Sequence, residues 1–308
     1  MKNYKFIYGP IPSRRLGKSL GVSPIPKKAC NYACIYCQLG QTQHMTNRRQ
    51  MFFEVEEILK EVEAVLQTDI DFDVITVVGE GEPTLYLGLE DLLKGIKAMT
   101  DKPLAVITNS GLMYLPEVRQ ALMSADIVLP SIDGYKAENF KKINRPYGKI
   151  NFSEMAEGLN IFSKAYPGQL WAEIMLMKGI NDSEDDFEAY KQVLEQLRYD
   201  RLYLNTPIRP PAEQSVEVIS DEAMEKAVDK LGGIAINLMA TNGFYSEIED
   251  DYQAILSIIK RHPMNQFELN HFLESRGCQT QANLICQLEA DPQIQMIVYK
   301  GYRTYRLR

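Results

Sequence analysis

The sequence has few of the features that mark a secreted or membrane protein. It carries five cysteines in 308 residues, an odd number that does not suit the disulfide framework of a secreted domain. No charged-then-apolar leader follows Met1, and no run of about eighteen apolar residues occurs. The net charge of -7 argues against the broad basic surface of a protein that coats nucleic acid. We expect a cytoplasmic protein that does not associate with membranes.

Three of the five cysteines fall within the stretch CNYACIYC, at Cys30, Cys34 and Cys37. Structural zinc sites and saturated iron-sulfur clusters are usually completed by four protein ligands. With three thiolates, either His44 gives a single zinc ion its fourth ligand, or a four-iron cluster keeps one iron open for a small molecule. The cluster is the favoured interpretation, and zinc and three ordinary thiols remain as alternatives.

Apolar, β-branched runs that end in Gly, Pro, Asn or Asp alternate with segments of helical spacing. The predicted strands are residues 20–25, 72–78, 104–108, 126–131, 170–177 and 201–206. Helices are predicted over residues 52–66 and after the N-caps Ser183 and Ser220. Six strands alternating with helices indicate an α/β fold with a parallel sheet. Since six strands are too few for an eight-stranded barrel, we expect a partial (β/α)6 barrel, with a flat doubly wound sheet as the alternative.

Residues 246–308 are predicted to form a small second domain after a core of residues 1–245. Helices at about 250–260, 265–275 and 279–289 precede a hairpin that turns at Lys300 and Gly301, which is the layout of a winged helix. Seven basic residues stand against eight acidic ones from 247 to 308, a balance that is poor for phosphate binding. Cys278 and Cys286 are expected to be buried structural residues.

The hairpin is the exception to this charge balance, because it interleaves basic and aromatic residues. Those residues are Tyr299, Lys300, Tyr302, Arg303, Tyr305, Arg306 and Arg308. Such a strand can stack on and neutralise single-stranded nucleic acid. The alternative, which we favour, is an edge strand whose tyrosines cover the domain's own core and whose basic residues keep the edge soluble.

Both sheet architectures place a functional site at the carboxyl ends of the parallel strands. Polar and glycine-rich segments follow each predicted strand there. They are the cysteine stretch, GEGEPT (79–84), TNSG (108–111), SIDG (131–134), KGIND (178–182) and NTPIRPP (205–211). Together they predict a ring of polar groups around one mouth.

The CxxxCxxC spacing, with Tyr36 before the last cysteine and GEGEP after the second strand, resembles the radical S-adenosylmethionine (radical SAM) superfamily. That superfamily has a Gly-Gly-Glu-Pro stretch where this chain inserts Glu80 between its glycines. The stretches GPIPSRRLGKSLGV, SIDG, NRPYG and KGIND are similar to the branch related to the tRNA wyosine-base synthases. The resemblance covers roughly residues 4–245.

The resemblance implies that Cys30, Cys34 and Cys37 hold a [4Fe-4S] cluster whose open iron binds SAM. It implies reductive cleavage of SAM to a 5'-deoxyadenosyl radical, which takes a hydrogen atom from a substrate. Reduced flavodoxin or ferredoxin is the electron donor that it implies. This chain lacks the further cysteines of a second cluster, which argues against a direct transfer of the wyosine-synthase activity.

The strand-end segments also supply the candidate SAM-binding residues, which are Tyr36, Gly79, Gly81, Glu82, Asn109, Ser131 and Asp133. Tyr36 is expected beside the adenine. Gly79, Gly81 and Glu82 are expected at the SAM amino group, through backbone and carboxylate oxygens. Asn109, Ser131 and Asp133 are candidates for the ribose hydroxyls or the methionyl carboxylate. Residues 175–177 are expected to form an apolar wall of the adenine pocket.

The substrate is expected to be anionic, with tRNA or another phosphate-bearing molecule as the candidate. Basic residues near the strand ends suit a phosphate or carboxylate, because Arg binds these groups with a bidentate fork. They are Arg14, Arg15, Lys18, Arg145 and Arg209. Solvated surface charge is an equal alternative for them. Two other functions stay open, namely an iron-sulfur redox sensor that binds nucleic acid through the winged helix, and a zinc protein.

Overall fold

An eight-stranded sheet runs through the larger part of the computed structural model, which describes residues 4–236, 244–246, 248–299 and 301–308. The strand order is β1-β2-β5-β6-β7-β8-β9-β10. The bounds are β1 (Ile7–Ser13), β2 (Gly17–Val22), β5 (Val74–Val77), β6 (Leu104–Thr108), β7 (Ile127–Pro130), β8 (Gln169–Met175), β9 (Arg201–Asn205) and β10 (Ile234–Ala235). β1 is antiparallel to β2, and all later neighbours pair in parallel.

Six of these strands, β2 and β5 to β9, are the predicted runs with small changes at their ends. The first predicted strand, residues 20–25, lies too far toward the C-terminus, because β2 begins at Gly17 and ends at Val22. β1 and β10 were not expected from the sequence. The β1 segment IYGPIPS contains a glycine and two prolines, which are turn signals, and an edge strand tolerates them because it loses fewer ladder hydrogen bonds.

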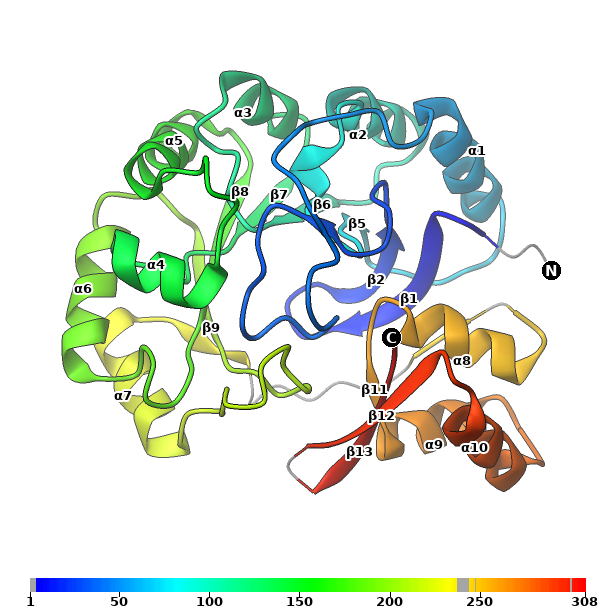
Figure 1. Cartoon of the computed structure of the whole chain (residues 1–308). Helices are drawn as coiled ribbons and strands as arrows, with labels where there is room; N and C mark the ends of the chain where they lie inside the picture. The colour runs from blue at the N-terminus through cyan, green and yellow to red at the C-terminus, as the bar shows by residue number, and fades with distance from the viewer. Residues whose placement is uncertain (1–3, 237–243, 247, 300) are drawn as a thin grey trace.

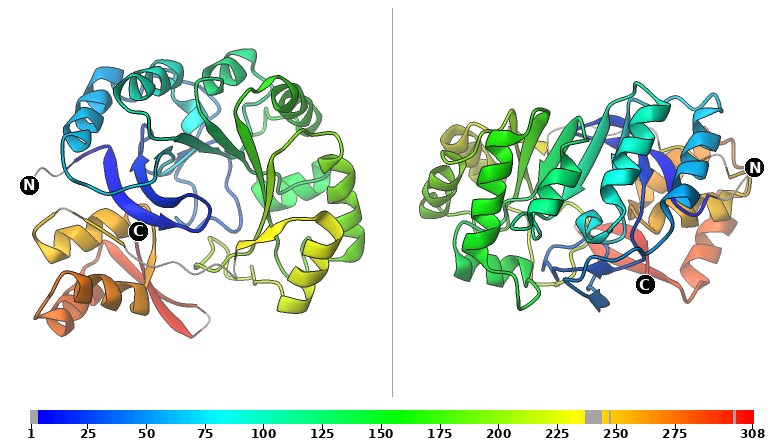
Figure 2. Two further views of the ribbon diagram at one scale, coloured as in Figure 1. Left: turned by 180° about the vertical axis from the view of Figure 1, so that it is seen from behind. Right: turned by 90° about the horizontal axis from the view of Figure 1, so that it is seen from above.

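The helices that connect the strands lie outside the sheet, in an arc that Figure 1 and Figure 2 show from three sides. They are α1 (Val55–Leu66), α2 (Leu89–Met99), α3 (Pro116–Leu122), α4 (Ala137–Asn144), α5 (Phe152–Ala165), α6 (Glu184–Leu194) and α7 (Asp221–Leu231), with a short 3-10 turn at Pro83–Leu85. Because the parallel strands follow each other in chain order, every connecting helix falls on the same side. The partial barrel is therefore confirmed, and the doubly wound alternative, which needs a reversal of strand order, is wrong.

The predicted helix starts depend on local capping. Ser183 forms a capping box with Asp186 at the start of α6, and the Ser220 hydroxyl accepts a hydrogen bond from the Ala223 amide at the start of α7. Both N-caps are confirmed. The helix predicted over 52–66 begins later, at Val55, where its buried stripe starts.

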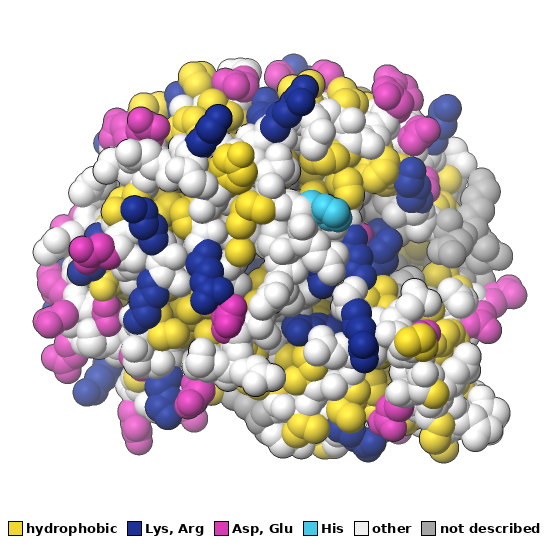
Figure 3. All heavy atoms as spheres, viewed as in Figure 1, with side chains coloured by type: hydrophobic (Ala, Val, Ile, Leu, Met, Phe, Trp, Pro, Cys, Tyr) yellow, Lys and Arg dark blue, Asp and Glu magenta, His cyan; other side chains and the backbone are white. Residues whose placement is uncertain are grey.

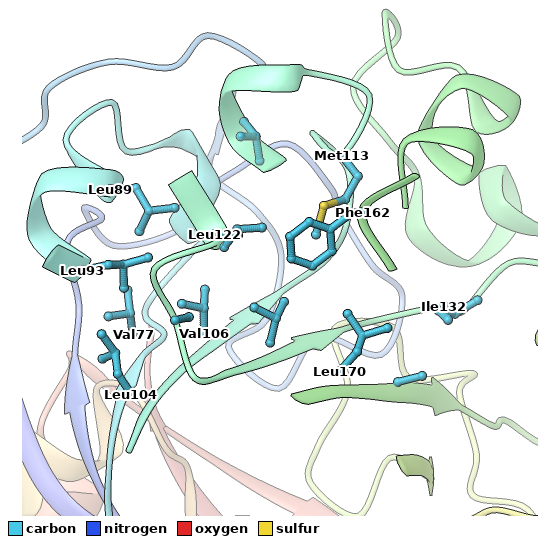
Figure 4. Close-up of a cluster of buried hydrophobic side chains, with 14 of the residues drawn as sticks. Val77, Leu89, Leu93, Leu104, Val106, Met113, Leu122, Ile132, Phe162 and Leu170 are labelled. Carbon is cyan, nitrogen blue, oxygen red and sulfur yellow. The ribbon is translucent and has the colours of Figure 1, made fainter. Parts of the chain in front are cut away.

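The main hydrophobic core lies between the sheet and the helix layer. Val77 and Val106 point outward from their strands and meet Leu93 of α2 and Leu122 of α3, as Figure 4 shows. Phe162 of α5 is fully buried and stacks on Tyr166, with ring centroids 4.7 Å apart. The alternate strand residues, such as Val74 and Ala105, belong to a separate inner cluster. Because successive side chains of a strand point to opposite faces of the sheet, one set packs on the helices and the other set can line a cavity on the inner face.

Residues 250–308 form what we call the C-terminal unit. Its elements are α8 (Asp251–Ile259), β11 (Met264–Asn265), α9 (Gln266–Ser275), α10 (Gln281–Ala290), β12 (Ile294–Tyr299) and β13 (Tyr302–Leu307). The strands make a sheet in the order β11-β13-β12 beside the three helices. The layout agrees with the one expected, while the winged-helix assignment and the boundary at 245/246 stay predictions. Lys300, which was expected in the hairpin turn, lies outside the described residues.

The C-terminal unit has its own core, which includes Ile255, Phe272 and Tyr305 and extends to Ile11 of β1. Just before it, the Tyr245 amide donates a hydrogen bond to the Pro10 carbonyl of the same strand, at 3.3 Å. The unit is thus packed against the antiparallel end of the large sheet (Figure 1).

The expectation that both cysteines of the C-terminal unit are buried is wrong for Cys286. Cys286 is exposed and Cys278 is partly exposed. Helix α10 contacts the core through the buried Leu288 and the partly buried Leu284 and Ile285, and Cys286 is not part of that contact. Among the described residues, we find no helix with the length and apolar character needed to cross a bilayer.

Replacement of Phe162 by Ala is expected to lower the free energy of unfolding by about 3–5 kcal/mol, because it empties a ring-sized volume in a packed core. The neighbouring Ile161 is 46% exposed on the same helix, so Ile161→Ala should cost about 0.5 kcal/mol or less. Urea unfolding followed by circular dichroism measures both. Equal losses for the two variants would contradict the placement of α5.

Candidate functional site

A cavity of about 390 Å³ opens where the parallel strands end. Residues at or just after the carboxyl ends of five neighbouring strands line it. They are Val78, Asn109, Ser131, Met175 and Asn205. The predicted position of the site at the strand ends therefore corresponds to a real concavity.

Cys30, Cys34 and Cys37 all line this cavity, and none of them is in a disulfide. Two of the sulfur atoms accept hydrogen bonds. The Tyr32 amide and the Asn109 side chain donate to Cys30 Sγ at 3.4 and 3.6 Å, and the Asn144 side chain donates to Cys34 Sγ at 3.5 Å. N–H donors aimed at sulfur stabilise the negative charge of thiolates that hold a cluster. These residues fit a [4Fe-4S] cluster with three protein ligands.

The zinc alternative finds no support in the arrangement of the side chains. His44 is exposed on the short strand β4 (His44–Met45) and does not line the cavity. Within the described ranges, no three His, Cys, Asp or Glu side chains converge as a single metal ion requires. A four-iron cluster binds each thiolate at a different iron, so its sulfur ligands need not converge on one point.

Burial raises the pKa of the Cys30 thiol to about 12 and raises the pKa values of Cys34 and Cys37. For Cys37 the positive charges of Arg306 and Lys28 oppose that rise. Since thiols bind metal as thiolates, assembly of a cluster here releases protons.

The GEGEPT loop is packed directly against the backbone of the cysteine loop. The Glu82 amide donates to the Ala29 carbonyl at 3.2 Å, and the Lys28 amide donates to the Glu80 carbonyl at 2.6 Å. A Cβ on Gly81 would lie 1.8 Å from the Ala29 oxygen, so no side chain fits there. Glycine at this position is a packing requirement that brings the loop next to Cys30.

The carboxylate of Glu82 is buried and already accepts four hydrogen bonds from the protein. The donors are the Thr84 amide and hydroxyl, the Thr108 hydroxyl and the Asn109 amide, at 2.6–3.1 Å. Burial raises the pKa of Glu82, and these donors oppose the rise. Three of these bonds fall on Oε1, so Oε2, which accepts only from the Asn109 amide, keeps an acceptor position for a ligand. The evident effect of the carboxylate is to tie the loop after β5 to the end of β6.

Of the other candidate SAM-binding residues, Tyr36, Gly79, Asn109 and Ser131 line the cavity. The Ser131 hydroxyl makes no hydrogen bond to any part of the chain that the structure describes. The Asn109 side chain is occupied by Cys30, Asn31 and Gly111. These residues are brought together as expected, and Ser131 has a hydroxyl that is free to bind a ligand.

Asp133 does not line the cavity. Its buried carboxylate accepts hydrogen bonds from the Tyr36 hydroxyl, from Asn144 Nδ2 at 2.8 Å and from the Met175 amide at 3.1 Å. It therefore lies behind Tyr36 and Asn144, whose positions it fixes. In the same way only Met175 of residues 175–177 lines the cavity, because Leu176 and Met177 are fully buried in the core.

Glu80, the residue inserted between the two glycines, faces the C-terminal unit. Its carboxylate lies 3.6 Å from Lys260 Nζ and 3.8 Å from Arg261 Nε. Glu80 and Arg261 are both buried, and Arg261 also donates to the Lys5 carbonyl at 2.9 Å. The insertion thus joins the loop after β5 to the turn that follows α8.

Three of the five predicted cations line the cavity, namely Arg14, Arg15 and Arg209. The other two do not, because Lys18 pairs with Asp71 at 2.5 Å and Arg145 pairs with Glu213 at 2.6 Å. Figure 3 shows Lys and Arg side chains gathered in the recess beside the C-terminal unit. The convergence of positive charge is real for the arginines of the β1–β2 turn and of the segment after β9.

The basic and aromatic residues of the hairpin are engaged in internal contacts. Tyr305 is buried and donates to Glu289 at 2.8 Å, and Arg303 pairs with the same carboxylate. Arg306 donates to the carbonyls of Gln38 and Pro210 at 3.3 and 3.2 Å. These contacts favour the structural interpretation of the hairpin, in which Tyr302 is 46% exposed.

Many cavity-lining residues were not predicted from the sequence, and among them are Lys28, Glu173, Arg261 and His262. Glu173 lies two positions from both Trp171 and Met175 in β8, so strand alternation could have assigned it to the inner face. Arg261 and His262 reach the cavity only because the C-terminal unit packs there. No local pattern of residues indicates such a contact.

A parallel partial barrel whose strand ends surround three free cysteines is the architecture of a radical SAM enzyme. The family described as the radical SAM superfamily matches residues 25–190, and the chain belongs to it. Its cofactors are a [4Fe-4S] cluster and S-adenosylmethionine.

The chain is also similar to proteins of several bacteria and archaea. It is 35% identical over 277 residues to a UPF0026 protein of Methanocaldococcus jannaschii, and the match covers 86% of this chain and 85% of that protein. It is 40% identical over 223 residues to a protein named GTPase Obg from Brachyspira hyodysenteriae, where the match covers 72% of this chain but only 33% of the other. In fold it resembles a solved structure of TYW1 with a lysine-pyruvate adduct bound, with a TM-score of 0.53 and 16% identity over 70% of this chain and 74% of that one.

Replacement of Gly81 by Ala is expected to destabilise the protein by about 1–3 kcal/mol, because the new Cβ would overlap the Ala29 carbonyl oxygen and force the two loops apart. Gly148→Ala is the control, since a Cβ there meets nothing within 4 Å. Thermal unfolding monitored by differential scanning calorimetry compares the two. A Gly81→Ala protein as stable as Gly148→Ala would contradict the close packing of the loops.

Proposed function

We propose that Cys30, Cys34 and Cys37 hold the [4Fe-4S] cluster and that SAM and a substrate share the cavity beside them. The observation that carries this proposal is the convergence of three free thiols and the segments after β5, β6 and β7 on one cavity. When bound, the cluster and SAM supply reductive cleavage to methionine and a 5'-deoxyadenosyl radical, which abstracts a hydrogen atom from the substrate.

In this proposal the chain positions the cofactors and excludes water. The N–H donors on Cys30 and Cys34 orient the thiolates and offset their charge. Tyr36, which is held by Asp133, provides an aromatic surface for the adenine. Ser131, whose hydroxyl is uncommitted, is the best candidate for a ribose hydroxyl or the methionyl carboxylate.

The SAM amino group is assigned to the backbone oxygens of the GEGEPT loop. Gly79 and Gly81 both line the cavity and have no side chains to block an approach. The Glu82 carboxylate also lines the cavity and is a candidate for the same contact, because its Oε2 accepts only from the Asn109 amide. Its bonds to Thr84 and Thr108 hold this loop in place.

We further propose that the substrate carries phosphate, as tRNA or as a smaller molecule, and that reduced flavodoxin or ferredoxin donates the electron. The arginines that line the cavity support an anionic substrate, because guanidinium groups bind phosphate by charge-assisted hydrogen bonds. Among the described residues of the hairpin, Arg303 and Arg306 are engaged in contacts within the protein, which gives the nucleic-acid sensor no comparable support.

The Cys34→Ala protein, reconstituted anaerobically and supplied with dithionite and SAM, is expected to form no 5'-deoxyadenosine above background, because one iron loses its ligand. Chromatography of the nucleoside measures this. Cys286→Ala removes an exposed cysteine of the C-terminal unit and should leave the yield unchanged. Nucleoside formation by Cys34→Ala at the unaltered rate would refute the assignment of the cluster ligands.

A further inference from the structure

Three of the four arginines that line the cavity lie beside a carboxylate. Arg15 forms an ion pair with Glu173, and Arg209 pairs with Glu268 at 3.2 Å. Arg261 lies near Glu80, and Glu82 accepts hydrogen bonds from uncharged donors. Paired charges in a low-dielectric wall are held in place and have less capacity to bind a ligand.

Arg14 is the exception among these arginines. It lines the cavity, and its Nε is buried without a hydrogen-bond partner. The Nε of Arg261 also lacks a hydrogen bond, but it lies 3.8 Å from the Glu80 carboxylate. Across the described segments it forms no ion pair with any carboxylate. A partly buried guanidinium without a counter-charge is costly, because its desolvation is not compensated. Arg14 is therefore a positive charge in the cavity wall that no carboxylate of the described residues pairs with.

Neighbouring cations intensify this imbalance. Burial and the charge of Arg209 lower the pKa of Arg14, which Glu268 opposes. The Arg209 guanidinium donates to the Pro263 carbonyl at 2.7 Å and contacts His262 Nε2 at 2.5 Å. Because arginine has no acceptor atom, His262 accepts at Nε2 and is neutral there. His262 therefore fixes Arg209 in place and adds no positive charge of its own.

The elements around Arg14 come from three distant parts of the chain. Arg14 lies in the turn between β1 and β2, Arg209 lies in the segment after β9, and His262 lies in the turn after α8. Within the described residues, the hydrogen bonds and the ion pair of the Arg209 side chain are all made with the C-terminal unit, through Pro263, Glu268 and His262. The C-terminal unit thereby completes a positive wall of the same cavity that the cysteines line.

We propose that Arg14 is the direct ligand of an oxyanion, a phosphate or a carboxylate, on the substrate, with Arg15 and Arg209 as neighbouring positive charges and His262 as a positioning residue. The identification of this anion as part of the substrate rests on the function proposed above. The existence of the anion subsite does not, because it follows from the unpaired charge in the cavity wall.

The test measures binding of inorganic phosphate, by equilibrium dialysis with the radiolabelled ion, to the cluster-loaded protein saturated with SAM. Saturation keeps phosphate out of the position that SAM occupies. Arg14→Gln should weaken phosphate binding about tenfold or more, the usual effect of losing a charge-assisted hydrogen bond. Arg14→Lys, which keeps the charge without the fork, should fall between wild type and Arg14→Gln. Competition by acetate distinguishes a site that also takes carboxylates from one that selects phosphate.

Arg145→Gln is the matched control, since it removes the same charge from an exposed pair with Glu213 outside the cavity. It should bind phosphate as the wild type does. The subsite is refuted if the wild type binds neither phosphate nor acetate, or if Arg14→Gln and Arg145→Gln weaken binding alike. If Arg14→Gln does not fold, an Arg14→Lys protein with wild-type affinity and no dependence on salt gives the same refutation.

The 5'-deoxyadenosine assay on the same preparation separates this inference from the proposed function. Phosphate binding that depends on Arg14 in a protein that forms no nucleoside would defeat the radical chemistry and leave the subsite intact. Nucleoside formation without Arg14-dependent phosphate binding would defeat the subsite alone.

Discussion

Backbone contact between the loop after β2 and the loop after β5 is the constraint on which the cavity depends. The Ala29 carbonyl receives the Glu82 amide and lies against Gly81, where even a methyl group would not fit. Glu82 then holds the end of β6 through Thr108 and Asn109. Three neighbouring strand ends are thus fixed by backbone atoms and one buried carboxylate. Among the described side chains that face the cavity, the Ser131 hydroxyl and the Arg14 guanidinium lack a partner in the protein.

The C-terminal unit extends this arrangement from the barrel to the far end of the chain. The Glu80 carboxylate, on the same loop, lies near Lys260 and Arg261, and Arg306 donates to the Gln38 carbonyl next to Cys37. A departure from the superfamily's Gly-Gly-Glu-Pro stretch thereby gains a physical reason, since a charge at this position has a partner in the C-terminal unit. The radical SAM core and the C-terminal unit build one cavity together.

The elements that could be predicted are those whose signals are local. β6 occupies the predicted residues 104–108, because that run is apolar and bounded by a proline and an asparagine. The cysteine spacing favours the cluster over zinc and ordinary thiols, and the family resemblance then implies it. β1 could not be predicted, because its prolines are tolerated only at a sheet edge. Asp133 was assigned to the cavity although its carboxylate lies behind Tyr36, and Arg261 and His262 depend on packing between distant segments. The direction of individual side chains and the contacts between distant segments cannot be predicted from a single sequence.

The contact between the C-terminal unit and β1 also affects how copies of the protein meet each other. A partial barrel is an unclosed sheet, and a terminal strand presents backbone N–H and C=O groups on which a strand of another molecule can add. Here Ile11 of β1 packs into the core of the C-terminal unit, and the Tyr245 amide donates a hydrogen bond to the Pro10 carbonyl. The prolines of β1 remove further donors from this border. The C-terminal unit, which completes the cavity, thus also covers the edge strand β1 and opposes aggregation through that edge.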